Sequence, residues 1–221
     1  MPPELDKEEA MEALVAEIKA CKKCPLHASR KNPVPGEGNL DAAVMLVGEA
    51  PGRWEDEKGR PFVGAAGKLL DRLLALAGLR REEVYIANVL KCRPPGNRDP
   101  RPEEVEACTP FLDRQIEIIR PKVIVTLGRH STRYLFSKAG LTFKKMGDVR
   151  GHVYEVELLG LKVLLIPTLH PASALYNPSY RSILESDFDL IGRVVRGAVQ
   201  PEKPGPELAR KRKGTLEEFM V

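Results

Sequence analysis

The four cysteines are the residues whose spacing most directly indicates chemistry. Cys21 and Cys24 form a C-x-x-C pair, while fifteen residues separate Cys92 from Cys108, unlike the second pair of a zinc ribbon. In a reducing compartment, four such cysteines are more often a metal site than two disulfides. Buried free thiols, or a redox pair at Cys21 and Cys24, are the alternatives. The residues alone do not separate zinc from an iron–sulfur cluster, because both accept four thiolates.

Basic residues flank these cysteines in the sequence, namely Lys22, Lys23, Lys91 and Arg93. A nearby positive charge stabilises a thiolate relative to the thiol. We therefore expect these side chains to lower the pKa values of the cysteines and to offset the charge of four thiolates.

A second group of reactive side chains lies where apolar runs end. Glu49 follows one run, Asn88 ends another, and His170 follows a third. In open α/β sheets the ligand binds beyond the carboxyl ends of the strands. A carboxylate, an amide and an imidazole are thus predicted to converge on one rim, which is the strongest internal indication of an active site.

The elements that must position these side chains alternate along the chain. Apolar runs typical of buried strands cover 43–48, 84–89, 123–128 and 163–167, and helical patterns cover 7–20, 65–78, 102–119, 129–138 and 181–197. Residues 153–158 alternate in polarity and, with Gly160, indicate a hairpin. The pattern predicts an α/β fold, a three-layer α/β/α sandwich around a mainly parallel four-stranded sheet, within a domain of residues 1–197.

Composition excludes several classes of protein. The chain has 221 residues, of which 43% are hydrophobic and 30% charged, so it is expected to fold rather than stay disordered. Its net charge of +4 permits a polyanionic partner without demanding one. No apolar run approaches the roughly 18 residues of a membrane span. The acidic start, without an apolar stretch, is no signal peptide, so we expect a cytoplasmic protein.

Taken together, the rim segments resemble the family 4 uracil-DNA glycosylases, the iron–sulfur branch of their superfamily. The resemblance spans roughly residues 14–195, and its motifs are specific in combination. The matching motifs are Val47-Gly48-Glu49-Ala50-Pro51-Gly52, Glu55-Asp56, Gly59-Arg60-Pro61-Phe62-Val63-Gly64, Gly67, Ala87-Asn88-Val89-Leu90-Lys91-Cys92-Arg93-Pro94-Pro95, Cys108 and His170-Pro171-Ala172.

The resemblance implies a DNA-repair enzyme. It would flip uracil, the product of cytosine deamination, out of single- or double-stranded DNA and hydrolyse the N-glycosidic bond, leaving an abasic site. It also implies that Cys21, Cys24, Cys92 and Cys108 hold a structural [4Fe-4S] cluster. No membrane partner is expected, and the enzyme is expected to be a monomer.

Three residues would bind the base by this resemblance. Phe62 looks like the stacking face, although a loop phenylalanine also commonly fills a core. The amide of Asn88 would read the pyrimidine edge, the alternative being that it satisfies a strand end. His170 would donate a hydrogen bond to uracil O2 as negative charge develops. The other histidines, His27, His130 and His152, default to surface or packing roles.

Three further positions complete the expected pocket. Glu49 would orient or activate the attacking water, with helix capping as the alternative reading. The backbone amide of Ala50 would help to bind the base. Glu55 would crowd the pyrimidine 5-position and so exclude the methyl group of thymine. In the loop after the final histidine, Leu175 is predicted to fill the gap that the flipped base leaves, with Ala174 and Tyr176 as neighbouring choices.

The end of the chain carries a separate motif. Residues 198–221 form a basic, proline-rich tail in which Leu216, Phe219 and Met220 would share one face of a helical turn. This spacing is similar to the peptide that docks sliding clamps (PCNA), although Lys213 replaces the usual glutamine. The alternative is an amphipathic tail that packs on its own domain.

Two other functions use the same residues. An iron–sulfur electron carrier would need the four cysteines but gives no reason for the polar groups on the rim. A non-catalytic nucleotide-binding domain would not need the intact catalytic positions.

Overall fold

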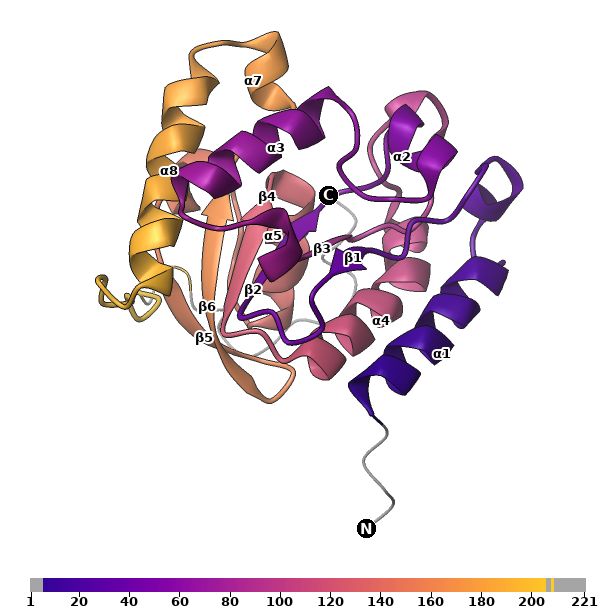
Figure 1. Ribbon diagram of the computed structural model, residues 1–221, viewed down its shortest axis with the longest axis horizontal. Coiled ribbons are helices and arrows are strands. Elements are labelled where there is room, and N and C mark those ends of the chain that lie inside the picture. Colours follow the sequence, from indigo (N-terminus) through magenta and orange to yellow (C-terminus); the bar gives the residue numbers. More distant parts are fainter. Residues whose placement is uncertain (1–5, 206–207, 209–221) are drawn as a thin grey trace.

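A mixed sheet forms the centre of the computed structural model, which describes residues 6–205 and 208 (Figure 1). Its strands run in the order β1-β3-β2-β4-β6-β5. Their bounds are β1 Glu37–Gly38, β2 Val44–Gly48, β3 Tyr85–Asn88, β4 Val123–Leu127, β5 Tyr154–Leu158 and β6 Leu161–Thr168. The four inner strands are parallel, and the two outer strands pair antiparallel to their neighbours.

The prediction of a four-stranded sheet was therefore wrong in number, because the sheet has six strands. The parallel part was predicted correctly, and β5 is the first strand of the hairpin expected at 153–158. The short strand β1 lies in a loop rich in proline and glycine, where two residues give no periodic pattern. Its pairing depends on the neighbouring strand β3 rather than on its own sequence.

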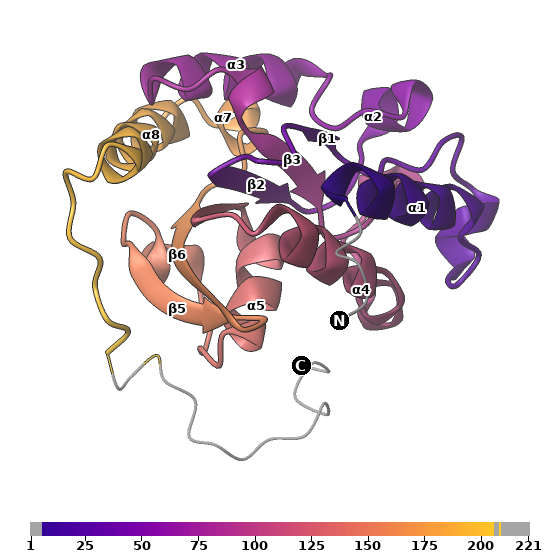
Figure 2. The same cartoon turned by 60° about the horizontal axis from the view of Figure 1, so that its bottom comes forward.

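Helices cover both faces of the sheet. The α-helices are α1 Lys7–Ala20, α2 Arg53–Lys58, α3 Ala65–Leu76, α4 Pro102–Ile119, α5 Arg129–Lys138, α6 Met146–Val149, α7 Ser173–Tyr176 and α8 Tyr180–Val195. Short 3-10 turns occur at η1 Pro25–Ala28, η2 Arg81–Glu83 and η3 Pro95–Asn97. Figure 2 shows α3 and α8 on one side of the strands and α1, α4 and α5 on the other, so the predicted three-layer sandwich is confirmed.

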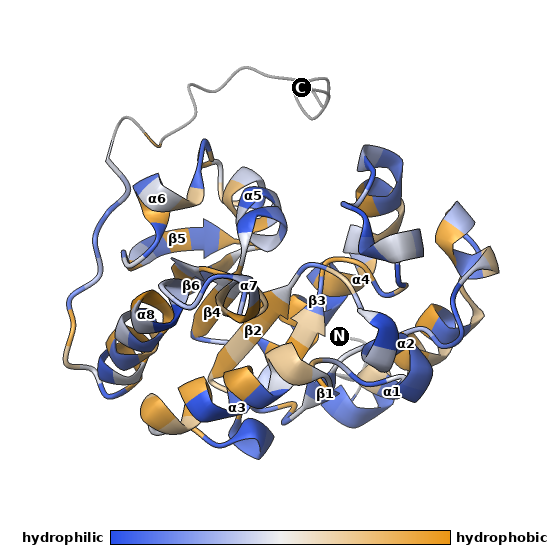
Figure 3. Ribbon diagram, turned by 90° about the horizontal axis from the view of Figure 1, so that it is seen from above, coloured by the Kyte–Doolittle hydropathy of each residue, from blue (hydrophilic) through white to orange (hydrophobic). Residues whose placement is uncertain are grey.

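Alternation of side chains along the strands divides the core in two. On β2, Met45 and Val47 pack with residues of α1 and α4, while Val44 and Leu46 pack with residues of α3 and α8. All five residues of the strand are buried, as expected for a parallel strand covered on both faces. Figure 3 shows the hydrophobic strands at the centre and hydrophilic residues on the outer sides of the helices.

The parallel strands bring their carboxyl ends to one edge. Gly48 at the end of β2 is paired in register with Asn88 at the end of β3, and Leu127 of β4 is paired with Thr168 of β6. The chain passes from β2 to β3 on one side and then crosses to β4 on the other. This change of direction opens a crevice between the loops at that edge.

The segment after α8 continues along the domain. Glu202 forms a parallel bridge with Tyr154 of β5, and its backbone N–H donates to the carbonyl of Val153 at 2.7 Å. Farther on, the carbonyl of Leu208 accepts a hydrogen bond from the N–H of Thr142. The start of the predicted tail thus lies against the sheet edge. The clamp-type residues Leu216, Phe219 and Met220 lie outside the described residues.

In the part of the chain that the structure describes, no helix has the length and apolar character needed to cross a membrane.

Candidate active site

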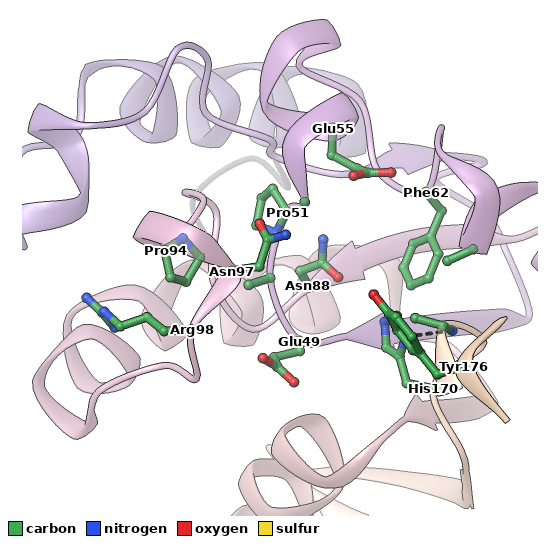
Figure 4. Close-up of a pocket in the computed structure, with 14 residues that line it drawn as sticks. Glu49, Pro51, Glu55, Phe62, Asn88, Pro94, Asn97, Arg98, His170 and Tyr176 are labelled. Atoms are coloured by element: carbon green, nitrogen blue, oxygen red, sulfur yellow. Dashed lines mark hydrogen bonds between the residues drawn. The ribbon is translucent and has the colours of Figure 1, made fainter. Parts of the chain in front are cut away.

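A cavity of about 280 Å³ lies at the carboxyl edge of the sheet. All six residues that the sequence predicted for catalysis or base binding line it (Figure 4). Its lining residues are Glu49, Ala50, Pro51, Gly52, Glu55, Phe62, Ala66, Asn88, Pro94, Asn97, Arg98, His170, Ala172 and Tyr176. The convergence of carboxylate, amide and imidazole follows from the common direction of the parallel strands.

Asn88 lines this cavity and carries a buried acceptor without a protein partner in the described part of the chain. The residue is 2% exposed, and its Oδ1 is buried without a hydrogen-bond partner among the described residues. A side chain at Gly48 would lie 2.3 Å from this oxygen, so glycine there leaves the amide its space. A buried polar atom without a partner is costly and points to a bound donor. If Asn88 only satisfied the hydrogen bonds at the end of its strand, this oxygen would be expected to have a protein partner.

His170 is held as a neutral donor. Its Nδ1 accepts a hydrogen bond from the backbone N–H of Ala172 at 3.1 Å, which leaves the ring proton on Nε2. Burial lowers the pKa of His170 to about 4, and the carboxylate of Glu55 opposes this only in part. At neutral pH the imidazole therefore carries no charge and offers one N–H to the cavity.

Phe62 is the aromatic wall. Its ring stacks on that of His170 with centroids 5.5 Å apart and an angle of 25° between the planes. The residue is buried rather than set on an exposed loop, and its φ of 51° is left-handed. Arg81 holds this turn, since its guanidinium donates to the carbonyls of Pro61 and Phe62 at 2.6 and 3.2 Å. Phe62 thus serves the core and the cavity together.

Glu55 fixes the other end of the same loop. Its Oε1 accepts hydrogen bonds from the backbone N–H groups of Val63 and Gly64 at 2.9 and 3.0 Å. The residue lies in α2, a six-residue helix at the rim that the sequence patterns did not predict. Its carboxylate therefore anchors the loop that carries Phe62 in addition to lining the cavity.

Glu49 is a carboxyl group with an altered acidity. Burial raises its pKa to about 7, the charge of Asp99 adds to this effect, and Arg129 counteracts it. The carboxyl is then close to half ionised at neutral pH, which suits a general base. Its backbone carbonyl accepts from the N–H of Leu90, which ties the loop after β2 to the loop after β3.

Sequence reasoning assigned no catalytic or binding role to Asp99, Arg129 or His130, which lie near Glu49. The Nε2 of His130 lies 3.7 Å from Glu49 Oε2 and 3.5 Å from Asp99 Oδ1. Arg129 donates from Nε to His130 Nε2 at 3.1 Å and also forms an ion pair with Asp99. His130 therefore lies beside Glu49 and Asp99, although it is not among the lining residues of the cavity. Its position after β4 was the signal that could have revealed it, because β4 ends at the same edge.

The loop after His170 places two large side chains differently. Tyr176 lines the cavity and is 89% exposed, while Leu175 is 47% exposed and is not among the lining residues. Both belong to the short helix α7.

The four cysteines gather around a small cavity of their own. Cys21 and Cys24 follow the end of α1, Cys92 follows β3, and Cys108 lies within α4. All four are free, and their charges are close enough to affect one another's pKa values. Backbone and side-chain N–H groups point to three of the sulfurs, from Lys23 to Cys21 at 3.5 Å, from Arg30 to Cys92 at 3.0 Å and from Lys91 to Cys108 at 3.2 Å.

The expected lowering of the thiol pKa values was wrong as a net effect. Burial dominates and raises the pKa of Cys24 and Cys92, and it raises the pKa of Cys108 to about 12. Lys91 does act in the expected direction on Cys108, and Arg30, absent from the sequence prediction, does so on Cys92. Four converging sulfurs with N–H donors fit a thiolate-bound metal centre, whose binding would displace the protons.

The chain is similar in sequence to known uracil-DNA glycosylases. Residues 35–189 match the model of the uracil DNA glycosylase superfamily. A type-4 uracil-DNA glycosylase of Archaeoglobus fulgidus is 56% identical over 193 residues, covering 87% of this chain and 96% of that protein. The type-4 enzyme of Saccharolobus solfataricus is 55% identical over 179 residues, 80% of this chain and 83% of that protein. That of Thermotoga maritima is 51% identical over 185 residues, 83% and 93% of the two chains.

The match covers the strands, the rim loops and the residues of the cavity. The chain therefore belongs to the uracil-DNA glycosylase superfamily and, within it, to the type-4 uracil-DNA glycosylases.

Proposed function

We propose that the cavity at the carboxyl edge of the sheet holds a uracil base turned out of DNA, with Asn88 as its reader. The chain is a uracil-DNA glycosylase, and it acts in the repair of DNA. The observation that carries the proposal is the buried, unpartnered Oδ1 of Asn88. An N–H group on the edge of a bound base would supply the donor that this oxygen lacks.

The amide of Asn88 separates uracil from cytosine. Its Oδ1 accepts the N3–H of uracil, and its NH₂ group donates to O4. Cytosine has no hydrogen on N3 and carries a donor at position 4, so both contacts would fail. A buried polar group left unpaired costs about 1–3 kcal/mol, so the cavity should bind uracil much more tightly than cytosine. The backbone N–H of Ala50 contributes a further contact to the base.

His170 and Phe62 stabilise the departing base. When the bond between N1 and C1′ breaks, its electron pair remains on uracil, and negative charge gathers on O2. The Nε2–H of the neutral His170 donates to that oxygen, while the ring of Phe62 stacks on the pyrimidine. A fixed neutral donor aimed at developing charge needs no reorganisation during the reaction.

Glu49 acts on the water. The carboxylate accepts a proton from a water molecule as the water oxygen forms its bond to C1′, which yields the abasic sugar and free uracil. A pKa of about 7 keeps the carboxylate available near neutrality and basic enough to take the proton. Uracil leaves as an anion and takes up a proton from solvent, and the proton on Glu49 returns to solvent.

Specificity and base flipping involve two other residues. Glu55, whose carboxylate borders the cavity, is proposed to crowd the 5-position and exclude the methyl group of thymine. Leu175 is proposed to fill the gap in the duplex, with its exposed neighbour Tyr176 at the mouth of the cavity. Such filling offsets part of the cost of unstacking the base.

We propose that Cys21, Cys24, Cys92 and Cys108 hold a [4Fe-4S] cluster. Support comes from the free, converging sulfurs and from the iron–sulfur character of the family that the sequence resembles. When bound, the cluster supplies a covalent cross-link between α1, α4 and the loop after β3. Its role is structural, because the reaction moves no electrons to or from the protein.

Two further proposals concern partners and location. Leu216, Phe219 and Met220 are proposed to dock a sliding clamp, on the strength of their spacing after a basic linker. A cytoplasmic site of action stays a prediction, as does the monomeric state.

The acidity of Glu49 predicts a pH profile. The carboxylate is the active form, so the single-turnover excision rate should rise as pH increases through about 7. Asp99→Asn removes a neighbouring negative charge and should move the midpoint of this rise in rate to lower pH. The shift should be less than about one unit because solvent screens the charge. Arg129→Gln should move the midpoint upward. Identical midpoints in all three proteins would contradict the assignment.

The cavity residues can be tested with defined oligonucleotides. Excision is expected for uracil opposite guanine or adenine and none for thymine opposite guanine. Asn88→Ala and His170→Ala should each lower the rate by about 10²–10³, the usual loss for one essential donor or acceptor. Alkaline cleavage of the abasic product reports the rate. The control is His152→Ala, which changes an exposed histidine. Full activity of Asn88→Ala or His170→Ala would contradict the role assigned to that residue.

The cysteine site predicts a linked loss of iron and stability. Cys92→Ser should lose visible absorbance near about 400 nm, iron content and thermal stability together. Metal analysis of the purified protein checks the identity of the centre. Zinc in place of iron would refute the cluster, and unchanged stability after loss of metal would refute its structural role.

The tail predicts a separation of binding from catalysis. Deletion of residues 214–221 should abolish pull-down by a sliding clamp and leave excision on short oligonucleotides unchanged. The paired substitution Leu216→Ala and Phe219→Ala should behave in the same way. Clamp binding that survives both changes would refute the proposal.

A further inference from the structure

Lys91 is a fully buried lysine between the cysteine cavity and the base-reading amide. It is 1% exposed, and its backbone N–H donates to the sulfur of Cys108 at 3.2 Å. Its Nζ donates to the backbone carbonyl of Asn88 at 2.8 Å and to Oε1 of Gln115 at 2.6 Å. Among the described residues, it takes part in no ion pair with a carboxylate, and burial lowers its pKa to about 8.

Gln115 completes this bridge from α4. The residue is fully buried, and its Nε2 donates to the carbonyl of Pro35 at 2.8 Å and to the hydroxyl of Tyr85 at 3.1 Å. Tyr85 begins the strand that Asn88 ends. One amide side chain therefore connects α4, the loop before β1 and both ends of β3.

The same helix carries Gln115 and Cys108, seven residues apart. Two helical turns separate these positions, so both side chains leave α4 on one face. The four-residue path from Asn88 to Cys92 is further tied by Lys91, whose carbonyl accepts from the N–H of Val34 at 2.7 Å. The cysteine ligands and the base-reading residue thus share one hydrogen-bonded support.

Burying a lysine without a carboxylate is costly, so its contacts need a function that an apolar residue would not supply. A backbone carbonyl at the end of a strand has no further strand residue to fix it. We propose that Lys91 and Gln115 are positioning residues that hold the Asn88 peptide against α4 and thereby fix the orientation of its base-reading amide. This inference rests on the proposed role of Asn88.

The consequence is a defined coupling. If Lys91 acts through Asn88, its removal should weaken uracil binding only while the amide of Asn88 is present. If it merely stabilises the fold, its removal should lower the melting temperature. The substitutions of Lys91 and Asn88 should then change the affinity for uracil independently of each other. Coupling between residues in one network is measured by a double-mutant cycle.

The experiment measures the dissociation constant of free uracil by titration calorimetry, with iron content and melting temperature on the same samples. The variants are Lys91→Met, Gln115→Leu, Asn88→Ala and the pair Lys91→Met with Asn88→Ala. Lys138→Met, which removes a partly exposed lysine from α5, is the matched control. Methionine and leucine keep much of the volume, and Gln115→Leu leaves Lys91 in place should Lys91→Met not fold.

We expect Lys91→Met and Gln115→Leu to retain iron and to bind uracil at least about tenfold more weakly, a change of about 1.4 kcal/mol. In the Asn88→Ala background, Lys91→Met should cause no further loss. Undiminished uracil affinity in Gln115→Leu, or an equal loss with and without the Asn88 amide, would overturn the inference. Unchanged affinity in Asn88→Ala alone would instead overturn the proposed role of Asn88.

Discussion

A single amide oxygen, buried at the end of β3 without a hydrogen-bond partner among the described residues, is the feature on which the site depends. Folding leaves this acceptor without a protein partner among the described residues, which is costly until a donor pairs with it. Uracil carries such a donor on N3 and cytosine does not. Gly48, the last residue of β2, leaves this oxygen its space, and the buried Lys91 holds the backbone carbonyl of the same asparagine.

Burial acts on two other groups of the cavity in opposite directions. It raises the pKa of Glu49 to about 7 and lowers that of His170 to about 4, because in each case the charged form loses solvation. The imidazole is therefore a neutral donor, while the carboxyl remains able to take a proton. One low-polarity environment thus keeps the imidazole neutral and raises the pKa of the carboxyl, while Asp99 and Arg129 act on that carboxyl in opposite directions.

Much of this was readable from the sequence because its cause is local. The apolar runs give the parallel strands, and the rule that their carboxyl ends share an edge brings Glu49, Asn88 and His170 together. What escaped prediction depends on distant neighbours. His130 comes to lie beside Asp99 and Glu49, the two-residue strand β1 forms only against β3, and burial overrides the cations beside the cysteines. Short helices such as α2 are below the length at which periodicity is visible.

The sequence by itself determined the order of the inner strands and the long helices, the edge where reactive groups gather and the set of four cysteines. Hydrophobic periodicity and the direction of the chain can be read from the sequence without knowing which segments pack together. Only the tertiary structure decided the protonation states, the left-handed turn of Phe62 and the buried link from α4 to Asn88. These depend on desolvation and on hydrogen bonds between segments far apart in the chain, which no local pattern encodes.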